Sequence, residues 1–216
     1  MRAFAAALLL AGAPGLAFAQ QPTIDPASLE RPLSGFVIDA RGSLAKFGQR
    51  PLTAAGLGVR PGDLPGPGLG VAVGAHLYLF HVGKATIGAG GEVLLARRSR
   101  QPLEESGALK GPVLHSRALS LAPQVSFNFG HRDGWSYVSA GVGSGSFETW
   151  AETGENPGRR VRVINYGGGA RWFNTSHLAF NVDLRFYQVA QAAAVTGSGD
   201  RPGARLLVLS AGVSVR

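Results

Sequence analysis

The chain has 216 residues, of which 45% are hydrophobic, only 16% are charged and 32 are glycine, and its formal net charge is +8. It contains no cysteine, which excludes disulfide bonds, zinc–thiolate sites and a thiol nucleophile. The length suits one domain or two small ones, and the positive charge alone does not select a partner.

The N-terminal segment predicts export. Arg2 precedes an apolar run over residues 3–13, and Ala17-Phe18-Ala19 then forms a small-residue cleavage pattern. These are the parts of a secretory signal peptide. A membrane anchor is a weaker interpretation, because a spanning helix needs about 20 apolar residues. We therefore assign residues 1–19 to a signal peptide of the general secretory route.

A lead segment and eight alternating segments follow. Residues 20–34 contain prolines and no periodic pattern, so we expect an extended periplasmic lead. From residue 35 to residue 216, bulky apolar side chains alternate with small or polar ones, which is the period of a β-strand. The expected strands are Gly35–Phe47, Gly68–Phe80, Ala85–Ala96, Leu119–Phe129, Trp135–Phe147, Val161–Phe173, Ser176–Tyr187 and Ala204–Val215.

One strand is ambiguous in its facing. In Trp135–Phe147, the apolar Val138 and Val142 oppose Trp135 and Tyr137, so both parities carry large side chains. The sequence alone does not decide which set faces inward.

The connections between these strands alternate in length. Residues 81–84, 130–134 and 174–175 form short turns, whereas residues 48–67, 97–117, 148–160 and 190–203 form long loops. The strands, at about 11 to 13 residues, exceed the roughly 5–6 residues usual in globular proteins and suit a tilted crossing of a bilayer. Short turns on one side and long loops on the other are typical of outer-membrane barrels.

The two faces of the strands indicate which side meets lipid. The apolar face is bulky and nearly free of charge, whereas the other face carries glycine, serine, amides and several charges. Such a face would make a poor core for a soluble protein, but it can fill the narrow interior of an eight-stranded barrel. Since unpaired buried charges cost several kcal/mol each, we expect a lumen charge network of paired residues. Its members are Asp39, Arg41, Glu92, Arg171, Asp183 and Arg185.

Together, the signal peptide, the alternating strands and the alternating loop lengths resemble the small bacterial outer-membrane β-barrel family, the OmpA/OmpX-like barrels. The resemblance covers residues 35–216 and rests on a pattern rather than a motif. It implies an all-β, eight-stranded, antiparallel up-and-down transmembrane β-barrel in the bacterial outer membrane. It also implies outer-membrane lipid, lipopolysaccharide and the barrel-assembly machinery as partners. The chain departs from the pattern in ending on Val215-Arg216 rather than on an aromatic residue.

Candidate chemistry is sparse. The five histidines lack the spacing of a metal site, so neither a metal nor a cofactor is expected. His115 and Ser116 invite a hydrolase interpretation, but neighbours on a strand point to opposite faces. We therefore assign no catalytic residue. The glycine clusters at 141–145 and 167–169 open no helix, so they predict relief of crowding in a narrow barrel rather than a phosphate loop.

Four arginines of the second long loop are candidates for contact with lipopolysaccharide phosphates through charge-assisted hydrogen bonds. They are Arg97, Arg98, Arg100 and Arg117. A solvated loop tip is the alternative. Nucleic-acid binding is disfavoured, because the arginines are dispersed and the chain is predicted to be exported.

Three functional hypotheses follow. The first is a non-enzymatic integral outer-membrane barrel that contributes to membrane integrity or to surface interactions through its long loops. The second is a barrel enzyme that modifies lipid A or phospholipid, which a Ser–His pair on adjacent strands near the outer rim would favour. The third is a secreted soluble lipocalin-like barrel that binds an apolar ligand, with its bulky face turned inward.

Overall fold

The computed structural model describes residues 33, 35–104, 106–153, 160–190 and 203–216. The signal peptide and nearly all of the lead segment lie outside these described residues, so both stay predictions. Among the described residues, no helix is long and apolar enough to cross a membrane.

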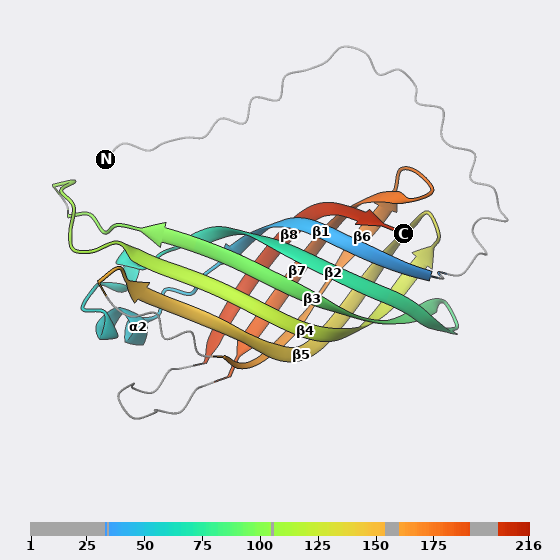
Figure 1. Cartoon of the computed structure of the whole chain (residues 1–216), viewed down its shortest axis with the longest axis horizontal. Helices are drawn as coiled ribbons and strands as arrows, with labels where there is room; N and C mark the ends of the chain where they lie inside the picture. Colours follow the sequence, from blue (N-terminus) through green and yellow to red (C-terminus); the bar gives the residue numbers. More distant parts are fainter. Residues whose placement is uncertain (1–32, 34, 105, 154–159, 191–202) are drawn as a thin grey trace, which may run out of the picture.

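Eight antiparallel strands close into a barrel in which each strand pairs with its neighbours in the chain, and the last strand pairs with the first. This confirms the predicted fold class. In Figure 1 the short turns lie at the right-hand end of the barrel, and helix α2 of the first long loop lies at the left. The strands are β1 (Gly35–Lys46), β2 (Pro67–Val82), β3 (Ala85–Arg100), β4 (Leu114–His131), β5 (Gly134–Ala151), β6 (Val161–Phe173), β7 (Leu178–Val189) and β8 (Ala204–Val215). The first long loop holds α2 (Pro51–Gly56) and the 3-10 helix η1 (Pro61–Asp63).

The central strands are longer than predicted. β3 continues to Arg100 and β4 begins at Leu114, so the ends of the predicted second loop are paired strand and the loop itself shrinks to residues 101–113. On β3 the prediction failed because all four residues 97–100 are exposed, so the alternation that marks a half-buried strand fades there. The first turn shrinks to Gly83-Lys84, where Gly83 adopts the positive φ of +58° that a tight hairpin turn uses.

Burial alternates along most of the barrel wall. On β1, Asp39 is fully buried while Ile38 remains 48% exposed. The ambiguous strand β5 follows the same rule, because Trp135 and Tyr137 lie inside and Val138 is 52% exposed. The bulky apolar face therefore points outward around the barrel. This arrangement contradicts the soluble lipocalin-like hypothesis, in which that face would line the interior.

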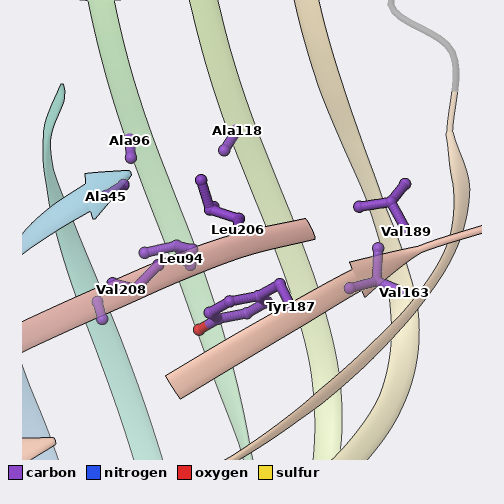
Figure 2. Packing of buried hydrophobic residues seen from close by; sticks show 10 residues of the cluster. Ala45, Leu94, Ala96, Ala118, Val163, Tyr187, Val189, Leu206 and Val208 are labelled. Carbon is purple, nitrogen blue, oxygen red and sulfur yellow. The ribbon is translucent and has the colours of Figure 1, made fainter. Parts of the chain in front are cut away.

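The lumen is filled by three layers of side chains. The end of the barrel with the long loops is its outer end and the end with the short turns is its periplasmic end, as in outer-membrane barrels. At the outer end, the layer drawn in Figure 2 gathers Ala45, Leu94, Ala96, Ala118, Val163, Tyr187, Val189, Leu206 and Val208. At the periplasmic end, a second apolar layer holds Leu33, Val37, Tyr78, Trp135 and Tyr137. The predicted charges lie between the two layers. A polar middle closed at both ends by apolar side chains leaves the barrel plugged rather than open.

Glycine makes this filling possible where strands approach closely. A Cβ on Gly143 would lie 2.0 Å from the carbonyl oxygen of Leu121, and one on Gly169 would lie 2.2 Å from that of Val182. No side chain fits at either position, which agrees with the prediction that these clusters relieve crowding.

Candidate functional site

All six predicted lumen charges lie inside the barrel, none more than 4% exposed. The first group is centred on Asp39 of β1. Arg171 of β6 donates from Nη2 to Oδ2 of Asp39 at 2.5 Å and from Nε to Oδ1 at 3.1 Å. Ser214 Oγ and Asn181 Nδ2 donate to the same Oδ1 at 2.6 and 3.3 Å. The carboxylate is therefore held by three neighbouring strands.

The second group joins the other four charges. Arg41 of β1 forms an ion pair with Glu92 of β3 and lies 3.4 Å from Asp183 of β7. Arg185 contacts the same two carboxylates, Asp183 at 3.0 Å and Glu92 at 3.4 Å. Two cations and two anions thus alternate across the lumen, which offsets the cost of removing each from water.

Two tyrosines complete this network, and the sequence prediction missed both. Tyr137 donates to Asp183 Oδ2 at 2.8 Å and Tyr187 donates to Glu92 Oε1 at 2.6 Å. The guanidinium of Arg171 also lies over the ring of Tyr137, 4.3 Å from its centroid. Parity could have identified Tyr187, which lies on the same inward side of its strand as Asp183 and Arg185. The charge-balanced network of three cations and three anions joins strands that lie far apart in the sequence.

The four predicted lipopolysaccharide contacts divide into two pairs. Arg97 of β3 and Arg117 of β4 are directly opposite each other in the register and share the parity of the lipid-facing residues. Arg98 and Arg100 have the other parity. Arg100 Nη1 donates to the carbonyl oxygens of Gly62 and Leu64, at 2.7 and 3.3 Å, and so fastens the first long loop.

The same loop carries a local ion pair outside the membrane-spanning strands. Arg60 donates to Asp63 Oδ2 from its backbone nitrogen at 3.2 Å and from Nε at 3.3 Å. Burial alone would raise the pKa of the Asp63 carboxyl, but these hydrogen bonds and the charge of Arg60 hold it below its usual value. Arg60 is therefore engaged within the loop.

Three further cations belong with Arg97 and Arg117. Lys46 ends β1, and Arg162 and Arg205 are the second residues of β6 and β8. Each of the five cations lies on the outward parity near the outer end of its strand. The next outward residue towards the bilayer is apolar in every case, in the order Leu44, Leu95, Leu119, Ile164 and Leu207. We call Lys46, Arg97, Arg117, Arg162 and Arg205 the cation girdle, because they border the apolar belt on its outer side.

The periplasmic ends of the strands are different. Their outward positions carry apolar and aromatic residues, including Phe36, Phe129, Trp172 and Val215. In the described strands, no lysine or arginine takes an outward position at this end, and Lys84 and Arg132 lie in the turns instead. The two edges of the apolar belt therefore differ in charge.

Beyond the girdle, one row of outward side chains combines a hydroxyl, an imidazole and an indole. Ser99, His115 and Trp150 are opposite one another on β3, β4 and β5. Ser99 Oγ lies 2.8 Å from His115 Nδ1, and the rings of His115 and Trp150 stack with centroids 5.4 Å apart. Ser116 faces the other way and bonds to Thr149 Oγ1 at 2.8 Å. The structure therefore agrees with the rejection of a His115–Ser116 pair. The strand register instead places Ser99 beside His115.

No protein-family model matches the chain, and no curated protein sequence matches it significantly. Among solved structures, Neisserial surface protein A is 14% identical, with a TM-score of 0.52, over 84% of this chain and 97% of that one. The attachment invasion locus protein Ail of Yersinia pestis is 14% identical over 85% and 99%, with a TM-score of 0.45. The outer membrane enzyme PagL is 14% identical over 82% and 99%, with a TM-score of 0.45.

The likeness to Neisserial surface protein A and the closed eight-stranded topology show the fold of small outer-membrane β-barrels, so the predicted resemblance is confirmed at the level of fold. The outward apolar belt requires lipid around the barrel, because a bilayer is the solvent that such a face matches. The chain is accordingly an integral β-barrel of the bacterial outer membrane.

Proposed function

We propose that this protein is a non-enzymatic barrel that stabilises the outer leaflet by binding lipopolysaccharide phosphates on its cation girdle. The observation that carries the proposal is the asymmetry of the belt. In the strand residues that the structure describes, five outward cations border its outer edge, with Glu148 opposite Arg117, whereas no outward cation borders its inner edge. Arginine is suited to phosphate because its donors form charge-assisted, bidentate hydrogen bonds. Each cation near an anionic membrane surface contributes about 1 kcal/mol.

The plugged lumen supports a role at the surface. The charges inside the barrel bind one another, and apolar layers cover them at both ends. The groups that are left to meet a partner lie on the outside of the barrel and in the loops beyond it.

The test compares two double variants that remove equal charge. Arg97→Gln/Arg117→Gln changes adjacent girdle cations, and Lys84→Gln/Arg132→Gln changes cations of the periplasmic turns. We expect lipopolysaccharide that co-purifies with the folded barrel, quantified from its hydroxylated fatty acids, to fall at least fivefold in the girdle variant alone. An equal fall in both variants would show that net charge, not the girdle, governs binding, and no fall in either would contradict the proposal.

A second candidate function is favoured by one observation, the 2.8 Å approach of Ser99 Oγ to His115 Nδ1. A hydroxyl beside an imidazole is the arrangement of a nucleophile and its base, and this pair lies just beyond the lipid belt. Under this candidate, Ser99 would attack the carbonyl carbon of a lipid ester while His115 takes the hydroxyl proton. His115 would return that proton to the alcohol as the ester C–O bond breaks, and water would then hydrolyse the acyl-serine and release the fatty acid. Release of fatty acid from lipid A or phospholipid by the purified barrel, and its loss in Ser99→Ala, would support the enzyme. Equal, background release by both proteins would exclude it.

A further inference from the structure

A groove of about 630 Å³ runs over the lipid-facing side of β4 to β7. Two rows of the register define it. In one row Ala140 of β5 lies between Val125 and Tyr166, and in the next row Gly168 of β6 lies between Val138 and Leu184. Small residues on adjacent strands, with large ones on either side, leave bare backbone as the floor.

The floor is fixed by close strand packing. A Cβ on Gly168 would lie 2.6 Å from the carbonyl oxygen of Tyr137, so a larger residue cannot replace this glycine without moving the backbone. On the side of β7, Phe186 stacks on Tyr166 with ring centroids 5.5 Å apart and forms a rigid wall. The groove is therefore a built feature of the surface rather than a gap between mobile side chains.

A girdle cation lies on the same face of the same strand. The outward residues of β6 run from Arg162 through Ile164 and Tyr166 to Gly168. Six residues of strand span roughly 20 Å. At a tilt of about 45° this corresponds to about 14 Å of depth, which is close to half of a hydrocarbon core about 30 Å thick. The path from Arg162 to the groove floor thus matches the depth of one leaflet.

The outer side of the groove is polar where a head group would begin. Gln188 Nε2 of β7 donates to the Tyr166 hydroxyl at 3.1 Å, and both residues lie between Arg162 and the apolar walls. A lipid that enters from the outer leaflet would meet a cation first, then an amide and a phenol, and then an apolar channel. This order is the polarity profile of an anionic lipid.

We propose that the groove holds one acyl chain of a lipopolysaccharide molecule whose phosphate binds Arg162. This inference rests on the proposed function and deepens it, because it assigns a defined binding site to one sector of the girdle. The rest of the girdle then meets lipopolysaccharide through charge alone.

The test fills the groove without touching a charge. Ala140→Leu replaces a methyl group over the floor with an isobutyl group, and Ala40→Leu makes the same change on the lipid-facing side of β1, away from the groove. Each folded barrel is mixed in detergent with purified diphosphoryl lipid A, and native mass spectrometry measures the fraction that carries one bound molecule. We expect that fraction to fall at least fivefold in Ala140→Leu and in Arg162→Gln, and to stay at the wild-type level in Ala40→Leu.

Other outcomes separate this inference from the proposed function. Wild-type binding in Ala140→Leu together with loss in Arg162→Gln would overturn the groove and leave the girdle. Wild-type binding in both would overturn both. A wild-type dimer that Ala140→Leu dissociates, with lipid binding unchanged, would assign the groove to a second copy of the chain and overturn the inference. A heat-modifiability gel shift of each variant checks that the barrel is folded.

Discussion

The lumen and the lipid-facing surface are built from alternate residues of the same strands, yet they are stabilised by different kinds of interaction. On β1, Asp39 is buried and accepts hydrogen bonds from Arg171, Ser214 and Asn181. Leu44, on the same strand, is 48% exposed and has lipid as its partner. The lumen depends on specific partners, whereas the outer face depends only on being apolar. A substitution should therefore cost most inside, where it leaves a buried partner without its counterpart.

The largest effect should come from breaking an ion pair in the lumen. Asp39→Ala leaves the guanidinium of Arg171 buried and unpaired, and we expect it to lower the free energy of unfolding by about 3–5 kcal/mol. Urea unfolding in phosphatidylcholine vesicles, followed by tryptophan fluorescence, measures this loss. The double variant Asp39→Ala/Arg171→Met should recover much of it, because no charge is then left alone. If the double variant is as unstable as the single one, packing rather than charge pairing holds this part of the lumen.

A charge on the lipid face should cost somewhat less. Val73 lies outward near the middle of β2 and is 51% exposed to the bilayer. Val73→Arg should lower stability by about 2–4 kcal/mol, the range for arginine near the bilayer midplane. The same substitution at exposed Leu52 in α2, outside the belt, should change stability by less than about 0.5 kcal/mol. Equal losses of stability at the two positions in the same unfolding assay would show that Val73 does not lie in the apolar belt.

Removing one tyrosine hydroxyl from the lumen and one from the lipid-facing surface compares the two regions directly. Tyr187→Phe deletes a hydrogen bond to the buried carboxylate of Glu92, and we expect a loss of about 1.5–3 kcal/mol. Tyr166→Phe deletes a bond to the exposed Gln188 side chain and should cost about 1 kcal/mol or less. The measurement is the ratio of the two losses in the free energy of unfolding, each obtained from urea unfolding. A ratio near one would show that a hydrogen bond in the lumen contributes no more to stability than one on the outer face.

The smallest effect should be that of a single girdle cation. Arg205→Gln should weaken binding of the barrel to anionic lipid A by about 1 kcal/mol, or roughly fivefold. Arg98→Gln removes the same charge at an inward-parity position and should leave binding unchanged. Raising the salt concentration should shrink the difference, because screening acts on exposed charges. A salt-independent difference would point to packing of the Arg205 side chain instead of its charge.

Much of the fold follows from alternation alone. The lumen charges could be chosen from the sequence because parity separates Asp183 and Arg185 from Leu184 and Phe186, and a buried charge demands a partner. Parity alone could not say which partner each charge takes, since that depends on how far each strand is shifted against the next.

Register also explains what the sequence prediction missed. Ser99 and His115 meet because β3 and β4 continue pairing beyond the apolar belt, in residues whose pattern had indicated a loop. Lys46, Arg162 and Arg205 were overlooked because each stands alone in the sequence, whereas Arg97, Arg98 and Arg100 form a visible cluster. The better signal was a cation two residues beyond the last apolar residue of an outward face. Applied to the cluster, this signal places Arg97 in the proposed girdle and leaves out Arg98 and Arg100, whose predicted lipopolysaccharide contacts stay predictions.

The pairing of β1 with β8 has a consequence for the order of events in folding. Seven of the strand contacts join neighbours in the chain and can form as local hairpins, but closure brings Ile38 beside Val215 from opposite ends of the barrel sequence. Until β8 arrives, the sheet has two bare edges whose N–H and C=O groups lipid cannot satisfy. Closure is therefore expected to be the slow and vulnerable step. An assembly machinery would have to protect the two edges of the open sheet until the barrel closes.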